Sequence, residues 1–486
     1  MRPTATEPLR RIADLPGPRG LPIVGNLFQA RPPLIHRDVE RWCRTYGPVF
    51  RMRFLKREMV VVVGDHALLA EMLRDRPEGW RRSPLVLQIA LEMGLYPGVF
   101  SSEGEAWRPQ RRMVMAGLDP GRVRAYFPTM HRVTERLARR WQAAAESGRP
   151  LELQSELMRY TVDTVAGLAF GRDINTLEDQ GDVIQQHLDR ILPTLFRRVM
   201  SPVPYWRWFK LPRDRAVDRS VAEVHRRIGD FIAEARARLA ADPARRAQPP
   251  NLLESMIVAA EEGREGIDDR TVSANVFTML LAGEDTTAHT LAWVLHLLHR
   301  NPATLARVMA EARREVPVDR PCNADDLAKL DVMDACLNEA MRLKPVAPFA
   351  VLHALRDTTI GDLQVPAGTE VWCALRHDSL QAHHFPEPDA FRPERWLAGA
   401  PGGEGAGDAP ANLSSAKRVA MPFGAGPRIC PGRYLALTEM KLLLAMLFTR
   451  FDIVSVDAPG GSEAAERMKF TMTPVGLTMR LAPRAR

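Results

Sequence analysis

Hydrophobic residues recur at intervals of three and four through most of residues 67–342, the spacing that gathers them on one face of an α-helix. Helices are therefore expected to dominate this region. The longest begins at Asp268 or Asp269, either of which suits an N-cap, and runs to Arg300 before Asn301 and Pro302. At 1.5 Å per residue it would span roughly 50 Å, enough to cross a whole domain.

Strand patterns lie at the two ends of the chain. Apolar runs at 49–54 and 59–63 surround a charged turn at 56–58, which predicts a small hairpin. After Pro345 the pattern breaks into loops and short strands, expected at 370–374 and within 468–481, with one last helix from Tyr434. The predicted fold class is mainly α with a minor β region.

The chain shows no internal repeat and no domain linker, so residues 1–486 are expected to form a single domain. Residues 1–26 are predicted to be a proline-rich opening segment, and the Gly- and Ala-rich residues 398–415 a flexible surface loop. A length of 486 residues exceeds what one hydrophobic core usually organises. Either several domains or a large buried group is therefore expected.

Composition narrows the class of protein. The five cysteines include no CxxC pair and no Cys/His cluster, which argues against a disulfide framework and a structural zinc site and favours a reducing compartment. The first 15 residues have no apolar core of an export signal, and no apolar stretch is long enough to cross a bilayer. We expect a cytoplasmic monomer without a transmembrane anchor. The formal charge of +8 is interleaved with acids, which argues against nucleic acid and leaves room for a small docking patch for an acidic protein.

The sharpest local signal is residues 423–432, where glycines and prolines force a tight loop that presents Cys430 just before an apolar helix. Loop N–H groups and the positive end of that helix would lower the thiol pKa and favour a metal-binding thiolate. The alternative is an inert buried thiol.

A second motif interrupts the long helix at residues 282–287. Gly283 costs helix stability and would let a flat ligand approach the backbone. Thr286 can bond back to the carbonyl of Ala282 and open the helix there, although a simple kink is the alternative. Conflicts of this kind usually mark function.

Two further pairs are weak when taken alone. Glu339 and Arg342 lie one helical turn apart, with Arg395 as a distant partner; alone, such a spacing usually means a surface ion pair. Trp107 and Arg111 form a WxxxR pattern.

In this order the four motifs resemble the cytochrome P450 superfamily. The resemblance covers nearly the whole chain, and the loop matches the haem-binding signature at Phe423, Gly426, Arg428, Cys430 and Gly432. It implies the cytochrome P450 fold and haem b as cofactor, with Cys430 as the iron ligand, Phe423 beside the sulfur, and Arg428 on a haem propionate.

The other motifs acquire roles from the same resemblance. Asp285 and Thr286 match an acid–alcohol pair that relays protons, Trp107 and Arg111 match donors to a propionate, and Glu339, Arg342 and Arg395 match a structural triad. One departure concerns a second basic residue for the propionates, which many members carry five positions before an aspartate. Here Leu352 stands at that place, and His353 is the nearest substitute.

The resemblance implies a monooxygenase that inserts one oxygen atom from O2 into an apolar small molecule such as a fatty acid, terpenoid or steroid. Electrons would come from a separate ferredoxin and ferredoxin reductase, because the sequence has no flavin-binding or iron–sulfur motif. The alternative is a haem protein that acts as a sensor or carrier without oxygenase activity. The expected substrate pocket includes Asn275, as a hydrogen-bonding group for a polar part of the substrate, together with Met279, Ala282, Val346, Phe349 and Met472. For Met279, core packing is the alternative.

Overall fold

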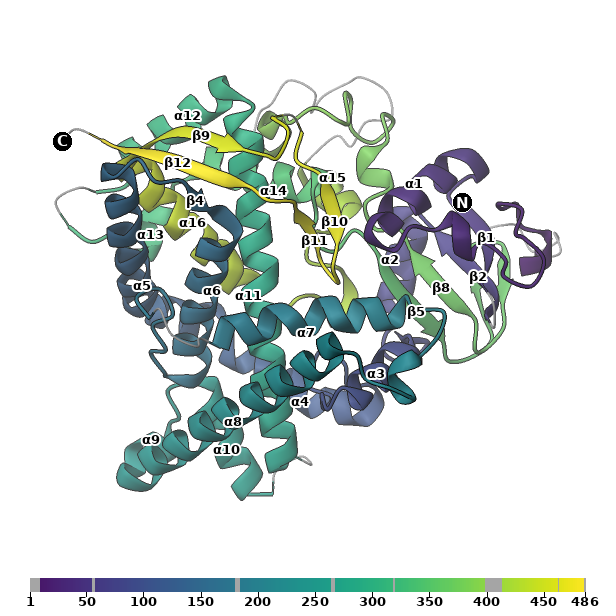
Figure 1. Ribbon diagram of the computed structural model, residues 1–486, viewed down its shortest axis with the longest axis horizontal. Helices are drawn as coiled ribbons and strands as arrows, with labels where there is room; N and C mark the ends of the chain where they lie inside the picture. The colour runs from purple at the N-terminus through teal and green to yellow at the C-terminus, as the bar shows by residue number, and fades with distance from the viewer. Residues whose placement is uncertain are drawn as a thin grey trace.

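Helices build most of the molecule in the computed structural model, and the long helix α11, Asp269–His299, runs through its middle (Figure 1). The structure describes residues 9–54, 57–179, 184–263, 267–317, 320–397, 413–461 and 463–484. Within them, the other α-helices are α1 Ile35–Tyr46, α2 His66–Arg74, α3 Pro84–Glu92, α4 Trp107–Gly117, α5 Pro120–Glu146, α6 Leu153–Phe170, α7 Ile184–Val199, α8 Pro212–Ala241, α9 Pro243–Ala247, α10 Leu252–Glu261, α12 Pro302–Glu315, α13 Ala324–Leu327, α14 Asp331–Leu343, α15 Leu413–Ala420 and α16 Arg433–Arg450.

Within the described residues the strands are short and fall into four sheets. They are β1 Val49–Phe54, β2 Arg57–Val63, β3 Trp80–Arg82, β4 Leu151–Glu152, β5 Ala350–Ala354, β6 Thr358–Ile360, β7 Leu363–Val365, β8 Glu370–Cys373, β9 Phe451–Asp457, β10 Glu466–Met468, β11 Met472–Pro474 and β12 Thr478–Pro483. Short 3-10 turns that matter below are η7 Asp378–Leu380, η8 Pro393–Trp396 and η9 Gly426–Arg428.

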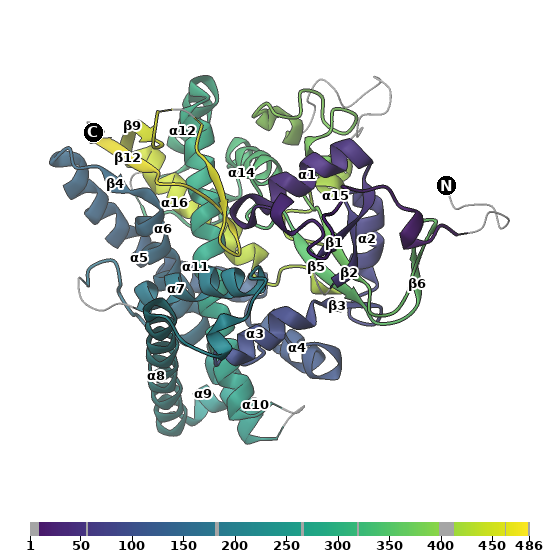
Figure 2. The same ribbon diagram turned by 45° about the vertical axis from the view of Figure 1, so that its right-hand side comes forward.

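The largest sheet has the strand order β1-β2-β8-β5-β3 and lies beside α1 and α2, on the side of the molecule away from the helical bulk (Figure 2). Only its β2–β8 pair is parallel; the other neighbours are antiparallel. This sheet brings residues near position 80 next to residues near positions 350 and 370, and that juxtaposition shapes the site below.

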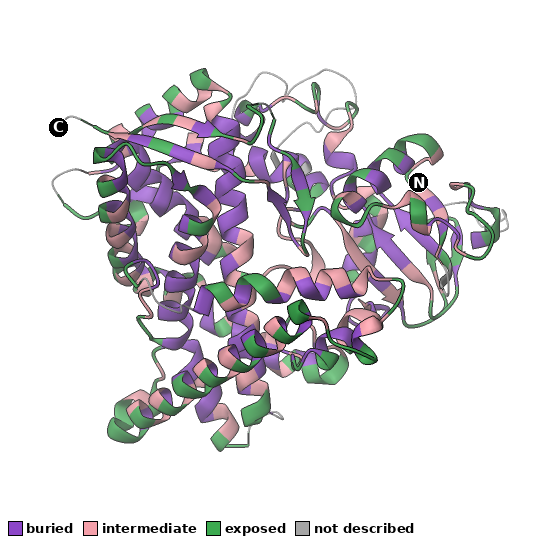
Figure 3. Cartoon of the chain, in the orientation of Figure 1, coloured by how far each residue is buried: buried purple, intermediate pink, exposed green. Residues whose placement is uncertain are grey.

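Helix α11 is where the core is deepest. The side chain of Asp268 accepts a hydrogen bond from Thr271 N at 2.7 Å and caps the helix, and the helix ends before Asn301 and Pro302 as the sequence predicts. Nearly all residues from Thr287 to Leu298 are buried (Figure 3). The helix is unbroken through residues 282–287, so the expected opening at Thr286 does not occur.

The predicted fold class is confirmed, and so are the hairpin, the strand near 370 and the last helix. Two short strands, β3 and β4, interrupt the region expected to be helical, because pairing with distant strands decides them. The predicted surface loop at 398–415 is too long at its end, since α15 begins at Leu413; residues 398–412 lie outside the described part, as do residues 1–8 of the opening segment. Among the described helices, none combines the length and apolar character needed to cross a bilayer.

Candidate functional site

The loop before α16 holds Cys430 in a turn that its glycines make possible. Gly424 and Gly426 have φ of 73° and 69°, and the N–H of Cys430 donates to the carbonyl of Phe423 at 2.9 Å. A Cβ on Gly426 would stand 2.2 Å from the carbonyl oxygen of Leu73, so only glycine lets the loop rest on the end of α2. Cys430 and Phe423 are both half-buried.

The thiol environment differs from the sequence-based expectation. Burial raises the pKa of Cys430, and the opposing effects of the Gly432 N–H group, Arg111 and Arg433 do not reverse that direction. The loop therefore does not make a thiolate by itself. A metal cation bound to the sulfur would hold it deprotonated.

Arg428, two residues before the cysteine, has guanidinium N–H groups without a hydrogen-bond partner in the described chain. Its Nη2 donates to the carbonyl of Ser102 at 2.7 Å and to Glu103, and its Cζ lies 4.3 Å from the ring centroid of Trp107. The buried Nε and Nη1 have no hydrogen-bond partner within the described chain. Burial lowers the pKa of Arg428 to about 10, with Glu103 opposing and Arg76 and Arg111 adding to the effect.

Two arginines that sequence analysis missed join this group. Arg76 is buried, 3.6 Å from Glu103, and its Nε and Nη2 also lack a hydrogen-bond partner in the described part. Burial lowers the pKa of Arg82 to about 9, and the charges of Arg76 and Arg428 lower it further. Glu103 is the one acid that lies close to Arg76, Arg82 and Arg428 among the described residues. The cluster therefore has an excess of positive charge, which a bound anion would stabilise.

Sheet register places His353 and Arg82 on opposite faces of the sheet. Residues directly opposite in an antiparallel pair share a face. His353 pairs with Arg81 and Glu370, whereas Leu352 pairs with Arg82. Arg82, opposite Leu352, therefore lies on the face where Arg76 and Arg428 lie, and His353 lies on the other face.

Helix α4 joins the cysteine loop to α11. Arg111 Nη2 donates to the carbonyl of Ile429 at 2.5 Å, and Gln110 Oε1 accepts from Asn275 Nδ2 at 2.9 Å. Asn275 is 1% exposed; its amide also donates to Thr271 O, and its oxygen accepts from Val99 N at 2.8 Å. The expected substrate hydrogen bond from Asn275 is therefore wrong, because its carboxamide is consumed in holding these segments together.

The middle of α11 presents one accessible stripe. Ala282 is exposed and Thr278, Asp285 and Thr286 are half-buried, a spacing of four, seven and eight residues that lies along one helix face. Thr286 Oγ1 donates to the carbonyl of Ala282 at 2.9 Å, the predicted back-bond. Gly283 has a different role from the one expected: a Cβ there would stand 2.4 Å from Val165 Cγ2, so the glycine serves the close packing of α11 against α6.

Thr471 and His289, which both follow Asp285 in the sequence, hold its carboxylate in place. Its carboxylate accepts a hydrogen bond from Thr471 and lies 3.2 Å from Nδ1 of His289, one helical turn on. Burial alone raises the pKa of Asp285, but His289, Thr471 and Lys469 together hold it below its ordinary value. Sequence analysis missed His289, although its i, i+4 spacing from Asp285 was visible. Burial and the charge of Asp285 raise the pKa of nearby Asp189, on α7, to about 6.

The remaining expected pocket residues divide into two groups. Val346 and Phe349 are half-buried, and Phe349 packs edge-on against Trp372 with centroids 5.0 Å apart. Met279 is buried in the main core, and Met472 is fully buried with its sulfur 3.5 Å from Nη1 of Arg376. Met472 thus contacts Arg376, and its neighbour Thr471 contacts Asp285.

Glu339, Arg342 and Arg395 are brought together as the spacing suggested. Arg342 binds Glu339 through two hydrogen bonds of 2.8 Å, and Arg395 Nε donates to the same carboxylate at 3.3 Å. Trp396 Nε1 and the Arg392 N–H also donate to it. Glu339 and Arg342 are fully buried, so this network fixes η8 against α14 and lies away from solvent.

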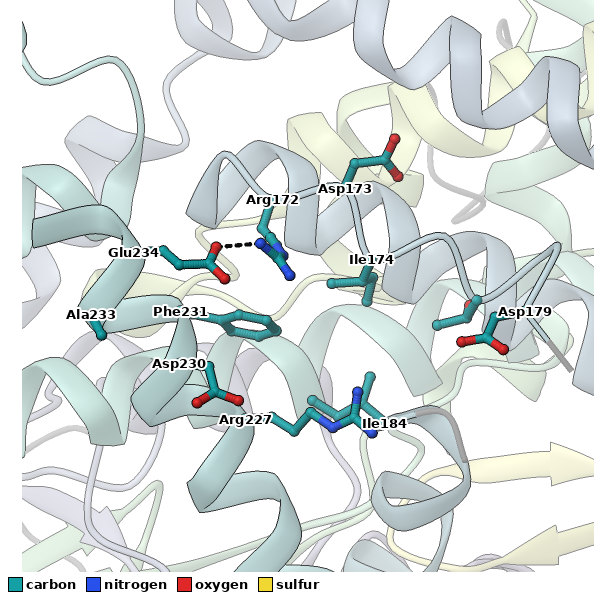
Figure 4. A pocket seen from close by; sticks show the side chains of 11 residues that line it. Arg172, Asp173, Ile174, Asp179, Ile184, Arg227, Asp230, Phe231, Ala233 and Glu234 are labelled. Atoms are coloured by element: carbon teal, nitrogen blue, oxygen red, sulfur yellow. Dashed lines mark hydrogen bonds and ion pairs between the residues drawn. The ribbon is translucent and has the colours of Figure 1, made fainter. Parts of the chain in front are cut away.

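A separate surface cleft lies between the end of α6 and α8 and is drawn in Figure 4. Its rim is charged and is crossed by the Arg172–Glu234 ion pair, with Phe231 and Ile184 at its floor. No residue of the cysteine loop, α4 or α11 lines it. We therefore place the chemistry at the cysteine loop and the accessible stripe of α11.

Comparison with known proteins identifies this arrangement. The family model described as Cytochrome P450 matches residues 15–480. The chain belongs to the cytochrome P450 family. A cyclooctat-9-en-7-ol 5-monooxygenase from Streptomyces melanosporofaciens is 31% identical over 72% of this chain and 71% of that protein. The human mitochondrial 25-hydroxyvitamin D-1 alpha hydroxylase is 27% identical over 96% of this chain and 91% of its own length. The crystal structure of the cytochrome P450DA heme domain shares the fold, with a TM-score of 0.81 at 24% identity over 99% of both chains.

Cytochrome P450 enzymes are haem b monooxygenases, and the residues of this chain fit that cofactor. Haem carries two propionate carboxylates, and Arg76 and Arg428 have buried N–H groups without acceptors in the described chain, with Arg82 beside them. Cys430 offers the sulfur ligand from a loop that rests on α2. On α11, the exposed residue Ala282 has a small side chain that leaves room for a bound group. The donor set, the positive charge and the accessible stripe of α11 therefore all fit a bound haem.

Proposed function

We propose that this cytochrome P450 inserts one oxygen atom from O2 into an apolar small molecule of the terpenoid, steroid or fatty-acid type, using electrons from a separate ferredoxin and its reductase. The observation that carries the proposal is the accessible stripe of α11, where Ala282, Asp285 and Thr286 lie together on one face. The bound haem supplies oxygen activation, which a cysteine thiolate ligand favours by pushing electron density toward iron.

The chain's own contribution is proton delivery. The hydroxyl hydrogen of Thr286 is used on the Ala282 carbonyl, so its oxygen is left to accept a hydrogen bond from a water or a reacting group. Asp285 is held by Thr471 and His289. A rotation of the Asp285 side chain away from Thr471 would bring its carboxyl group toward Thr286. A sensor or carrier would have no use for such a relay, which favours the oxygenase over that alternative.

The apolar substrate class rests on two observations. Phe100 lies near Phe470, and the N–H of Met472 donates to the carbonyl of Val346, so both apolar residues come from segments beside Thr471, with Phe349 three residues further on. Relatives include a cyclooctat-9-en-7-ol 5-monooxygenase and a steroid 17-alpha-hydroxylase/17,20 lyase. Asn275 is not available to hydrogen-bond a substrate, so substrate recognition would rely on shape and apolar burial.

The electron donor is proposed to dock on the face of the cysteine loop. Arg112 is exposed on α4, and Arg433 is half-buried with its Cζ 4.6 Å from the ring centroid of Tyr434. Arg108, expected to join them, is paired with Glu78 and Glu105 and contributes little net charge. A monomer and a cytoplasmic location stay predictions from the sequence.

The test is turnover under labelled oxygen. Holoenzyme is screened with terpenoids, steroids and fatty acids for shifts of the haem spectrum, and the binders are incubated with ferredoxin, its reductase and ¹⁸O2. One ¹⁸O atom per product molecule is expected. Binding without any labelled product, at electron-transfer rates that reduce the haem, would favour the sensor or carrier instead.

A further inference from the structure

A cluster of metal-ligating side chains lies outside the haem region, where α2 begins and η7 follows β8. It consists of His66, Asp378 and His384, and its ligand atoms all lie within 4.8 Å of one another. His66 Nδ1 is 2.8 Å from Asp378 Oδ2, and His384 Nε2 is 3.5 Å from the same oxygen. The imidazole rings of His66 and His384 pack edge to face, with their centroids 4.7 Å apart.

We propose that His66, Asp378 and His384 form a binding site for a divalent transition metal ion, with Zn²⁺ as the reference ligand. Two imidazole nitrogens and one carboxylate oxygen are the donor set that zinc accepts in proteins, with water or a further ligand completing a tetrahedron. Nothing in the haem chemistry uses these three residues.

The two separations that involve Asp378 are close to what zinc requires. Bonds of about 2.0–2.1 Å to N and O ligands at tetrahedral angles place the ligand atoms roughly 3.3 Å apart. The His384–Asp378 separation already matches at 3.5 Å, and the His66–Asp378 contact of 2.8 Å must open by about half an ångström. Side-chain rotation of His66 supplies that movement without displacing the backbone.

The site is both supported and reachable. Asp378 also accepts a hydrogen bond from the backbone N–H of His66 at 2.8 Å, so one ligand fixes the backbone of another. The side chain of Asp378 is 8% exposed, whereas those of His66 and His384 are 26% and 18% exposed. An ion can therefore enter from solvent and retain a water ligand.

Metal binding would tie together segments that are far apart in sequence. His66 opens α2, and α15 packs against both α2 and η7. The other end of α2 carries Leu73, whose carbonyl lies against Gly426 of the cysteine loop. An ion bound at the start of α2 would thus steady the helix on which the cysteine loop rests.

The experiment uses the haem-loaded protein dialysed against Zn²⁺, followed by metal analysis and a thermal melt. One tightly held zinc per chain and a raised melting temperature are expected. His384→Gln and Asp378→Asn should each weaken zinc binding by tenfold or more while the haem spectrum stays unchanged. His299→Gln is the matched control, since His299 lies far along the sequence at the end of α11, and it should bind zinc like the parent.

X-ray absorption at the zinc edge distinguishes this site from cysteine sites. The expected first shell contains only N and O atoms at about 2.0–2.1 Å, whereas a sulfur shell near 2.3 Å would overturn the assignment. Zinc binding that is absent, or equal in all four proteins, would overturn it as well.

Discussion

Arg82 on β3 lies directly opposite Leu352 on β5, and their side chains share one face of the sheet. The neighbouring pair, Arg81 and His353, faces the other way. This register places the guanidinium of Arg82 with Arg76 and Arg428, where a haem propionate would meet it. Arg82 is therefore predicted to take the role of a basic residue at position 352.

We therefore expect Arg82→Gln to hold haem less firmly. A hydrogen bond to a charged group contributes about 1.5–3 kcal/mol, which corresponds to haem release roughly 10- to 100-fold faster. The measurement is haem transfer to an excess of apo-globin. Arg356→Gln, at an exposed arginine already paired with Asp75, is the control and should release haem like the parent; equal release from all three proteins would refute the assignment of Arg82.

Cys430 is predicted to be the only protein ligand on its side of the iron. The other four cysteines of the chain, Cys43, Cys322, Cys336 and Cys373, lie outside the glycine-rich loop at 423–432. The reduced protein with carbon monoxide should show the red-shifted Soret band of a thiolate ligand, and Cys430→Ala should lose it. Cys373→Ala, a buried control near Arg76, should keep it. An imidazole-type band in the parent would exclude Cys430 as the ligand.

Changes at the proton relay should separate rate from coupling. Asp285→Asn removes the group that His289 and Thr471 position, and turnover should fall by roughly 10²- to 10⁴-fold with haem content unchanged. Thr286→Ala should consume reducing equivalents mainly as peroxide. The readouts are product formed, peroxide formed and NAD(P)H consumed.

Thr287→Ala is the matched control for this pair, because Thr287 is buried beside the accessible stripe. It should remain coupled. The relay hypothesis fails if Asp285→Asn and Thr286→Ala turn over as fast and as tightly coupled as this control.

Glu466 should contribute stability that depends on pH. Burial alone raises its pKa, but His36, Arg376 and Lys344 hold the pKa of Glu466 far below its ordinary value. Glu466→Gln should lower the free energy of unfolding at pH 7 by about 3 kcal/mol, because it removes one of the two acids bound to buried Arg376.

The sign of the pH effect follows from the lowered pKa. The stabilisation is complete above the unfolded pKa of about 4.3 and is lost as pH falls toward the lower folded value. The gap between parent and Glu466→Gln should therefore shrink below pH 4, by up to about 1.4 kcal/mol per pH unit, in urea unfolding followed by circular dichroism. Glu394→Gln, which loses an exposed pair with Arg307, should differ from the parent by less than about 1 kcal/mol at every pH. A constant gap for Glu466→Gln would contradict the linkage.

Reduction by ferredoxin should depend on Arg433 and on salt. Steering between opposite charges weakens as the screening length falls from about 10 Å at 0.1 M salt to about 3 Å at 1 M. We expect added salt and Arg433→Gln each to slow the first electron transfer from ferredoxin and to leave reduction by dithionite unchanged. Arg108→Gln is the control, since its charge is already paired. Rates that ignore salt in every protein would remove the docking proposal.

The sequence by itself determined whatever depends on neighbours along the chain. Helix α11 starts at the Asp268 cap, Thr286 bonds to the carbonyl four residues back, and the glycines at 424 and 426 turn the cysteine loop, because each rests on a few consecutive residues. The ordered motifs then fixed the family and with it the Glu339–Arg342–Arg395 network.

Only the tertiary structure decided which distant segments meet. The face of α11 that is accessible, the α6 side chain that excludes a Cβ at Gly283, and the strand that opposes Leu352 all depend on partners 70 or more residues away. Asn275 and Met472 are residue types that suit a substrate pocket, yet both are buried. Asn275 forms hydrogen bonds with Gln110 and Val99, and Met472 contacts Arg376. A side-chain pattern gives the period of a face, and packing alone chooses what that face meets.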